Sequence, residues 1–144
     1  MHTPEISCKI TGYCQIHPSE DPKKIHQAIS NILPYSEIHI EDETAKISAN
    51  NLKSLGRIFE TMHSRKSQRA YLRHMKRNLN DSSTWFYLNK QAAYANNVAL
   101  CDEADESPLG PIKIILHSNR IEEVMDWLTL EWDQQNSRQM TQKF

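Results

Sequence analysis

The sequence predicts an α+β fold in which helices pack on one face of an antiparallel sheet, in the order β-α-β-β-α-(α)-β-β-β-α. Three observations support this prediction. Apolar and polar residues alternate in most expected strands, which is typical of strands with one buried face. Short connections between neighbouring strands favour hairpins. Other segments carry apolar residues at helical spacing and follow residues that cap helices well.

The length of 144 residues fits one domain, which we expect over residues 1–132, followed by a frayed tail over residues 133–144. Hydrophobic residues make up 38% and charged residues 24%, which is typical of a globular chain rather than a disordered one. No apolar run approaches the roughly 20 residues of a membrane helix. The first residues lack the basic and apolar regions of a signal peptide, so we expect a cytoplasmic protein without a membrane partner.

The first third of the chain is expected to form a strand, a helix and a hairpin. Residues 6–16 alternate as a half-buried strand does. Asp21 is a good N-cap, and Pro22 at the first helical position has no amide hydrogen to leave unpaired. The helix that they start ends at Pro34. Residues 38–49 alternate on both sides of an acidic turn and predict a hairpin.

The middle of the chain is expected to be helical. Asn50 or Asn51 caps a helix whose apolar face extends to Met62. The pattern falters at residues 63–64 and resumes over residues 70–79. This predicts either a second helix or a kinked continuation of the first.

The last third is expected to hold three strands and a final helix. Residues 84–88 form an apolar strand, residues 98–101 a short strand, and residues 112–117 an alternating strand. The segment between the first two is not assigned. Ser118 or Asn119 is expected to cap the final helix.

The net charge of −1 hides two oppositely charged parts. Residues 53–77 contain eight lysine and arginine residues and one acid, Glu60, for a net charge of +7. The rest of the chain carries −8. Such a basic segment favours a polyanionic partner or an acidic surface within the protein.

Four arginines in this segment are spaced four residues apart, which on one helix places them along a single ridge, about 6 Å from one to the next. Arginine side chains bind phosphate groups through paired hydrogen bonds, and duplex nucleic acid presents phosphates at comparable spacing. Two lysines flank the ridge. The residues predicted to contact RNA phosphates are Arg65, Lys66, Arg69, Arg73, Lys76 and Arg77.

Two other interpretations of the basic ridge stay open. It can be a solvated helix face whose repulsion is relieved by carboxylates that the fold brings near. It can also be the surface of a protein-interaction module, such as a homodimer in which the ridge faces an acidic loop of a second copy. That loop contains Asp102, Glu103, Asp105 and Glu106.

A polar triplet, Asn89, Lys90 and Gln91, follows the apolar strand over residues 84–88. The amides of Asn89 and Gln91 could read base edges while Lys90 contacts phosphate. Alternatively, the two amides end the strand by bonding free backbone groups. A third hypothesis, an enzyme acting on a small molecule, needs a pocket lined by Asn89, Lys90 and a carboxylate.

Signatures of enzymes and metal sites are missing from the sequence. There is no nucleotide-binding glycine loop, no nucleophile elbow and no HExxH motif. The seven histidines lack ligand-like spacing, and three cysteines without a CxxC pair argue against a disulfide framework and a structural zinc site. We therefore expect no catalytic residues, no metal and no cofactor.

The segment TWFYLNKQAAYANNVAL, followed by ESPLGPIKIIL, resembles an archaeal family of uncharacterised proteins grouped with predicted RNA-binding proteins. The resemblance covers roughly residues 6–130. It implies a fold similar to large-subunit ribosomal protein five, with helices against an antiparallel sheet, and it favours a non-enzymatic RNA-binding protein. The signature residues that it implies are Asn89, Lys90, Gln91, Pro108, Leu109, Gly110 and Pro111.

Overall fold

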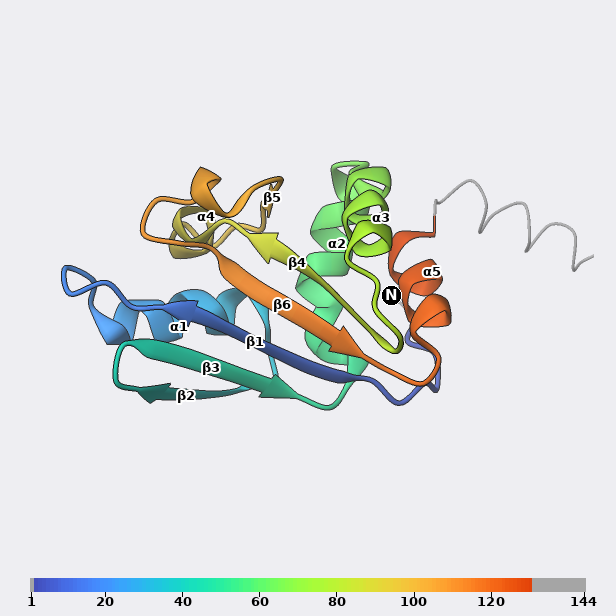
Figure 1. Cartoon of the computed structure of the whole chain (residues 1–144), viewed down its shortest axis with the longest axis horizontal. Helices are drawn as coiled ribbons and strands as arrows, with labels where there is room; N and C mark the ends of the chain where they lie inside the picture. Colours follow the sequence, from blue (N-terminus) through green and yellow to red (C-terminus); the bar gives the residue numbers. More distant parts are fainter. Residues whose placement is uncertain (1, 131–144) are drawn as a thin grey trace, which may run out of the picture.

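The order of helices and strands agrees with the prediction, with one additional short helix, α4, in the segment that was not assigned. The computed structural model describes residues 2–130, so the expected tail over residues 133–144 lies outside the described residues. Two 3₁₀ turns, η1 and η2, complete the set (Figure 1). The elements are β1 (Lys9–Gln15), α1 (Pro22–Ile32), β2 (Glu37–Glu41), β3 (Thr44–Ala49), η1 (Leu52–Leu55), α2 (Gly56–Ser64), α3 (Gln68–Arg77), β4 (Ser83–Leu88), α4 (Lys90–Tyr94), β5 (Leu100–Cys101), η2 (Ala104–Glu106), β6 (Ile112–His117) and α5 (Ile121–Thr129).

The six strands form one sheet in the order β2-β3-β1-β6-β4-β5. Every neighbouring pair is antiparallel, which confirms the predicted sheet type. Strands β2 and β3 form the predicted hairpin over residues 38–49. Strands β1 and β6, which come from opposite ends of the chain, pair at the centre of the sheet. Strands that are distant in sequence therefore build the middle of the molecule.

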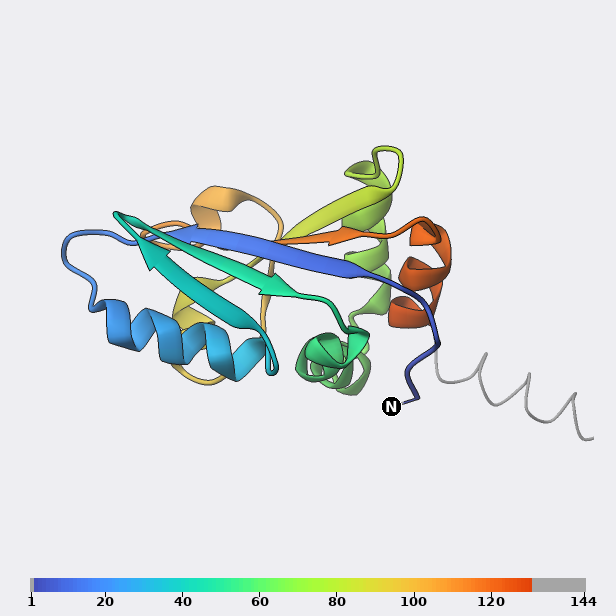
Figure 2. The same ribbon diagram turned by 90° about the horizontal axis from the view of Figure 1, so that it is seen from below.

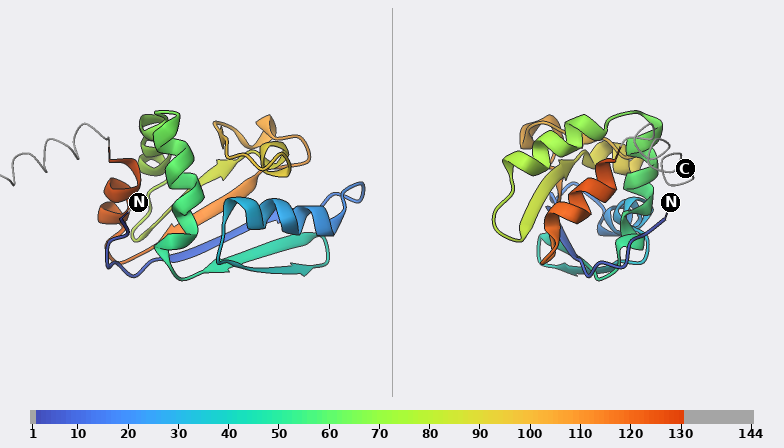
Figure 3. Two further views of the ribbon diagram at one scale, coloured as in Figure 1. Left: turned by 180° about the vertical axis from the view of Figure 1, so that it is seen from behind. Right: turned by 90° about the vertical axis from the view of Figure 1, so that its right-hand side faces the viewer.

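Helices cover one face of the sheet, as predicted. Figure 2 shows α1, α2 and α5 on the same side of the strands, and the left panel of Figure 3 shows α1 and α2 lying across that face. The core residues of β4 and β6 alternate accordingly: Phe86 and Ile114 are fully buried, whereas Trp85 and Lys113 are only half-buried. Phe86 packs edge-on against Tyr71 of α3, with ring centroids 5.4 Å apart. No helix of residues 2–130 covers the opposite face of the sheet.

A side-chain cap starts α1 as expected, because the Asp21 carboxylate accepts a hydrogen bond from the backbone N–H of Lys23 at 2.9 Å. Asn51, rather than Asn50, accepts from the backbone N–H of Lys53 at 2.9 Å, but it caps the 3₁₀ turn η1. The helix α2 that follows begins without a side-chain cap. The final helix differs from the prediction, because its N-cap position is Arg120 and no side chain caps it.

Gly12 lies at the centre of the sheet, where β1 approaches β6 closely. It pairs with Ile47 of β3 and Ile114 of β6. A Cβ atom at this position would lie 2.6 Å from the backbone oxygen of Lys113 and 3.3 Å from Cδ1 of Ile47. The missing side chain is therefore a requirement of the packing rather than of the backbone conformation.

All three cysteines are buried and free, and they pack as small apolar side chains. Burial raises the pKa of Cys8, Cys14 and Cys101 to about 11. The thiols therefore stay protonated at neutral pH.

Candidate nucleic-acid interface

The basic segment folds into two helices, and α3 carries most of its exposed charge. Four exposed cations of α3 lie within an arc of about 100° of the helix surface, and this helix contains no acidic residue. Tyr71 and Met75 hold the other side of the helix in the core. The α3 cationic surface consists of Arg69, Arg73, Lys76 and Arg77.

Arg65 does not belong to this surface, so the prediction of a single four-arginine ridge is wrong. The chain turns between α2 and α3, where Lys66 adopts a positive φ of 54°. Arg65 ends α2 and donates hydrogen bonds to the backbone oxygen of Val98 at 3.2 Å and to Oδ1 of Asn97 at 2.7 Å. It fixes the loop after α4. Lys66 is exposed in the turn, just before α3.

A second arginine of the basic segment has a similar structural contact. Arg57 of α2 donates to the backbone oxygen of Asn96 at 2.6 Å and to its Oδ1 at 3.2 Å. Asn96 has a positive φ of 58°, a conformation that asparagine tolerates better than most residues. Part of the charge in the basic segment therefore holds the α4–β5 loop in place.

One acid of the predicted acidic loop contacts α3 within the same chain. The buried His74 ring lies between Asp102 Oδ1, 2.8 Å from Nε2, and Arg77 Nη2, 2.9 Å from Nδ1. Because arginine only donates, Nδ1 must accept, and Nε2 donates to the carboxylate. The fold thus relieves some of the repulsion on α3 internally. No second copy is needed to bring Asp102 to the helix.

The polar triplet forms the start of α4 rather than the end of a strand. Asn89 is the N-cap, and its Oδ1 accepts from the backbone N–H of Ala92 at 2.9 Å. Asn89 thus bonds a backbone group, as the structural interpretation expected, but that group belongs to the first turn of α4 and not to the sheet. Gln91 is exposed on α4, and its Nε2 lies 3.5 Å from the Pro108 backbone oxygen.

Lys90 is fully buried, so the prediction that it contacts phosphate is wrong. Its ammonium group donates to the backbone oxygens of Leu109 and Gln15 at 2.7 and 2.8 Å, and to Glu20 Oε1 at 3.0 Å. These three acceptors match its three N–H donors. The relative exposure of the two side chains is 0% for Lys90 and 4% for Glu20. Lys90 therefore cannot line a substrate pocket, as the enzyme hypothesis would need.

The two signature motifs contact each other through this lysine. The backbone N–H of Lys90 donates to Ser107 Oγ at 3.0 Å, and Ser107 Oγ donates to the Gly110 oxygen at 2.9 Å. With the bond from Lys90 Nζ to Leu109, these contacts fasten the start of α4 to the turn before β6. The signature therefore has a structural explanation.

Glu20 is held ionised in this buried setting. Burial alone raises the pKa of its carboxyl group, but hydrogen bonds from Tyr94 Oη, the His17 N–H and Lys90 Nζ lower it, and the net shift is downward. The Tyr94 bond is short, at 2.6 Å. Charge-assisted bonds of this kind favour the carboxylate over the acid.

The free energy of unfolding is expected to fall at acidic pH, because Glu20 becomes protonated there. A carboxyl group with a lowered pKa in the folded protein stabilises it above the unfolded value, ordinarily 4.5, and that contribution is lost as the pH falls through the folded value. The variant Glu20→Gln should therefore lose less stability than the wild type as the pH falls below about 4.5. Urea unfolding at several pH values measures this. Glu37→Gln, at an exposed position, is the control. If the free energy of unfolding falls equally steeply with pH in the wild type and in Glu20→Gln, then Glu20 is not a carboxyl group whose pKa is lowered by folding.

The uncovered side of the sheet carries aromatic and basic residues that were not predicted as a site. We call it the open sheet face: Lys46, Tyr13, Lys113, Tyr87 and Trp85. In the register of the sheet, Lys46 pairs with Tyr13, Tyr13 with Lys113, and Lys113 with Tyr87. Cations and aromatic rings therefore alternate in one row across β3, β1, β6 and β4. The alternation of Trp85 and Tyr87 with Phe86 and Leu88 indicated that the first two residues share one side of the strand. It did not indicate that this side is open.

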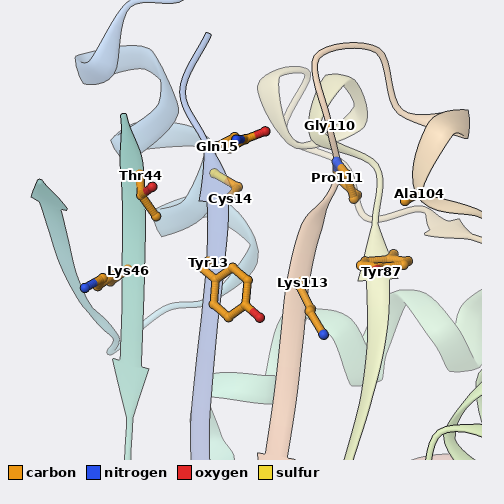
Figure 4. A pocket seen from close by; sticks show the side chains of 10 residues that line it. All are labelled: Tyr13, Cys14, Gln15, Thr44, Lys46, Tyr87, Ala104, Gly110, Pro111 and Lys113. Atoms are coloured by element: carbon orange, nitrogen blue, oxygen red, sulfur yellow. The ribbon is translucent and has the colours of Figure 1, made fainter. Parts of the chain in front are cut away.

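The rings and ammonium groups of the open sheet face lie close together. The ring centroids of Trp85 and Tyr87 are 4.9 Å apart, and Lys113 Nζ lies 4.3 Å from the Trp85 centroid and 5.8 Å from that of Tyr13. Tyr13 is 46% exposed. An open hollow of about 620 Å³ lies along this row, beside the η2 loop (Figure 4). Its lining residues are Tyr13, Cys14, Gln15, Thr44, Lys46, Tyr87, Ala104, Gly110, Pro111 and Lys113.

The described residues show neither a metal centre nor a membrane span. Within residues 2–130, no three His, Cys, Asp or Glu side chains are placed to hold a metal ion together. No helix in this part of the chain is long and apolar enough to cross a membrane.

The fold and its surfaces define an α+β protein built on one antiparallel sheet, with a cationic helix on the covered side. A family model described as RNA binding matches residues 9–118, and the chain belongs to this family. It is similar to a UPF0201 protein of Methanothermobacter thermautotrophicus, with 35% identity over 122 residues that cover 83% of this chain and 89% of the relative.

Solved structures agree with the fold. The crystal structure of a UPF0201 protein is 30% identical, with a TM-score of 0.72, and the match covers 85% of this chain and 94% of that one. A UPF0201 protein from Methanococcus jannaschii is 23% identical, with a TM-score of 0.69 and a match over 84% of this chain and 92% of its own. The second comparison supports the fold alone.

Proposed function

We propose that this protein binds RNA without catalysing a reaction, and that the α3 cationic surface supplies phosphate contacts. The observation that carries the proposal is α3 itself, a ten-residue helix with exposed cations on one face and no carboxylate of its own. The family description, RNA binding, supports the same function. Phosphate contacts of this kind act through charge and depend little on sequence.

Two residues are the best candidates for direct phosphate contact. Arg73 and Lys76 are exposed on α3, and among the described residues neither has a hydrogen bond or ion pair. Arg77 contributes while it also donates to His74. Arginine can hold a phosphate with two parallel bonds, whereas lysine acts as a point charge. Lys66, at the turn before α3, extends the cationic region along the backbone of a bound RNA.

RNA affinity is expected to fall steeply with salt, because binding releases counterions from the phosphates. Four phosphate contacts correspond to a slope of about −3.6 in log affinity against log salt, or roughly a 150-fold loss from about 50 to 200 mM. The double variant Arg73→Gln/Lys76→Gln should reduce the slope to about −1.8 and weaken binding about tenfold or more at low salt. Fluorescence polarisation with a labelled RNA duplex of about 16 base pairs measures both quantities.

The matched control removes two lysines from a distant helix. Lys23 and Lys24 are exposed at the start of α1, at the other end of the sheet from α3 (Figure 1). The variant Lys23→Gln/Lys24→Gln loses the same charge and should keep the wild-type slope. Equal losses in both double variants would show that binding follows net charge alone, and an unchanged slope for the α3 variant would rule out this surface.

The alternative, a homodimer or other protein interaction at the basic surface, makes a different prediction. A dimer held by α3 and the acidic loop dissociates as salt rises, and light scattering detects this change in mass. A monomer that binds duplex RNA supports the proposal instead. Asp102 already contacts His74 within one chain, which removes one acid from the set that a second copy could offer.

A further inference from the structure

We propose that the open sheet face binds an unpaired segment of RNA, whose bases stack on Tyr13, Tyr87 and Trp85 while Lys46 and Lys113 contact its phosphates. The inference rests on the proposed RNA-binding function but concerns a second surface, on the other side of the sheet from α3. The ligand class of that surface is single-stranded RNA rather than duplex.

Within residues 2–130, the ring contacts of these aromatic residues are with one another and with Lys113. Their strand neighbours Phe86 and Leu88 point to the opposite side and fill the core. Tyr13, Tyr87 and Trp85 lie instead on the side without a helix, and Tyr13 is among the exposed large apolar side chains. Aromatic rings grouped on an open face of a sheet offer flat surfaces on which bases can stack.

The spacing of the row suits a chain of nucleotides. Neighbouring strands are about 4.8 Å apart, so the four positions from β3 to β4 span roughly 14 Å. Within this span each ring lies beside a lysine: Tyr13 between Lys46 and Lys113, and Tyr87 next to Lys113. A strand of RNA alternates bases and phosphates along its length. Alternating rings and ammonium groups are the complementary arrangement.

The charge of the face favours phosphate. Strands β1, β3, β4 and β6 contain three lysines, Lys9, Lys46 and Lys113, and no acidic residue. The acids nearest in the sheet lie on β2, at its edge, where Glu37 and Glu41 are exposed. The other end of the row is also acidic, because Ala104 lines the hollow and its neighbours Glu103, Asp105 and Glu106 are exposed. A polyanion is therefore attracted to the four central strands and repelled from both borders, which confines it to the row from β3 to β4.

The same features argue against other occupants. In a duplex the base faces stack on each other and are not open to aromatic side chains. A second copy related by two-fold symmetry would bring the lysine-bearing rows of both copies together, and like charges that meet in an interface are unfavourable. An unpaired RNA segment offers both free base faces and negative charge.

The test compares a labelled oligouridine of about 10 nucleotides with the duplex of about 16 base pairs. The variants Tyr13→Ala and Tyr87→Ala should each weaken oligouridine binding about tenfold, and the double variant about a hundredfold, because each removes one stacked base. Duplex affinity should change less than about threefold. Tyr13→Phe and Tyr87→Phe keep the rings and should retain binding.

Controls separate a lost contact from a lost fold. Tyr35 is 82% exposed and lies outside the strands, so Tyr35→Ala removes an exposed tyrosine without touching the face. Exposed Lys46 can be changed to glutamine with little risk to the core, and Lys46→Gln should reduce the salt slope for oligouridine by about 0.7. Retained duplex binding by each variant shows that the protein is folded.

The outcomes are distinct. If the wild type binds neither RNA, the proposed function and this inference both fail. If it binds the duplex but not oligouridine, or if oligouridine binding is indifferent to the tyrosine variants and to Lys46→Gln, this inference alone is overturned. A dimer in light scattering that Tyr13→Ala dissociates would identify the face as a protein interface and also overturn it.

Discussion

Replacing Lys90 with methionine is expected to lower the free energy of unfolding by about 3–5 kcal/mol, the largest effect of any exchange considered. Lys90 is fully buried, and its ammonium group has three acceptors. Methionine fills similar space but leaves Glu20 charged and without its cation, and it removes the donor to two backbone oxygens. Breaking one side of a buried pair exposes the full desolvation penalty of the other. Urea denaturation at neutral pH measures the change.

The matched control is Lys24→Met, at an exposed position, with an expected change within about 0.5 kcal/mol. The double variant Lys90→Met/Glu20→Gln should be more stable than the sum of the single effects predicts, because no unpaired charge remains. If the two single effects add up to the effect of the double variant, or if Lys90→Met is as stable as the wild type, then the ion pair contributes little to the free energy of unfolding.

Adding a side chain at Gly12 is expected to be the second most damaging change. In Gly12→Ala the new methyl group would lie 2.6 Å from the Lys113 backbone oxygen, so β1 and β6 must move apart at the centre of the sheet. The backbone of a central strand cannot shift without weakening its ladder, and overpacking of this kind costs about 1–3 kcal/mol. Gly12→Val should cost more than Gly12→Ala. Thermal or urea unfolding gives both values.

Thr11 provides the comparison for Gly12. It is the neighbouring residue of the same strand, but its side chain faces the open side of the sheet and is half-buried. Thr11→Ala should change stability by less than about 1 kcal/mol. If Gly12→Ala proves neutral or stabilising, β1 and β6 are not as tightly apposed as the geometry indicates.

The order of elements was predictable because its signals are local. The alternation of residues 6–16, of which Lys9–Gln15 form β1, and the Asp21 cap followed by Pro22 each depend on a few neighbouring residues. The short helix α4 was missed because five residues are too few for a helical period to show against a strand pattern.

The errors in the site have a different cause, since they depend on contacts between distant segments. Nothing in the turn before α3 marks a break: it contains no glycine or proline, and Lys66 takes the positive φ. Arg65 then bonds residues 32 and 33 positions away. A lysine is expected at the surface by default, and Lys90 is buried only because acceptors 19 to 75 positions away meet it. The exposure of Trp85 likewise depends on which face the helices cover.

The Lys90 contacts also bear on how one end of the molecule opens to solvent. The lysine joins the last residue of β1, the loop before α1 and the turn before β6. None of these segments can separate from the others without breaking a charged bond in the interior. Amide hydrogens of α4 and of the Ser107–Gly110 turn should therefore exchange with deuterium through one shared opening rather than by independent fraying. A residue that resembled a ligand contact is thus expected to make this end of the domain open as one cooperative unit.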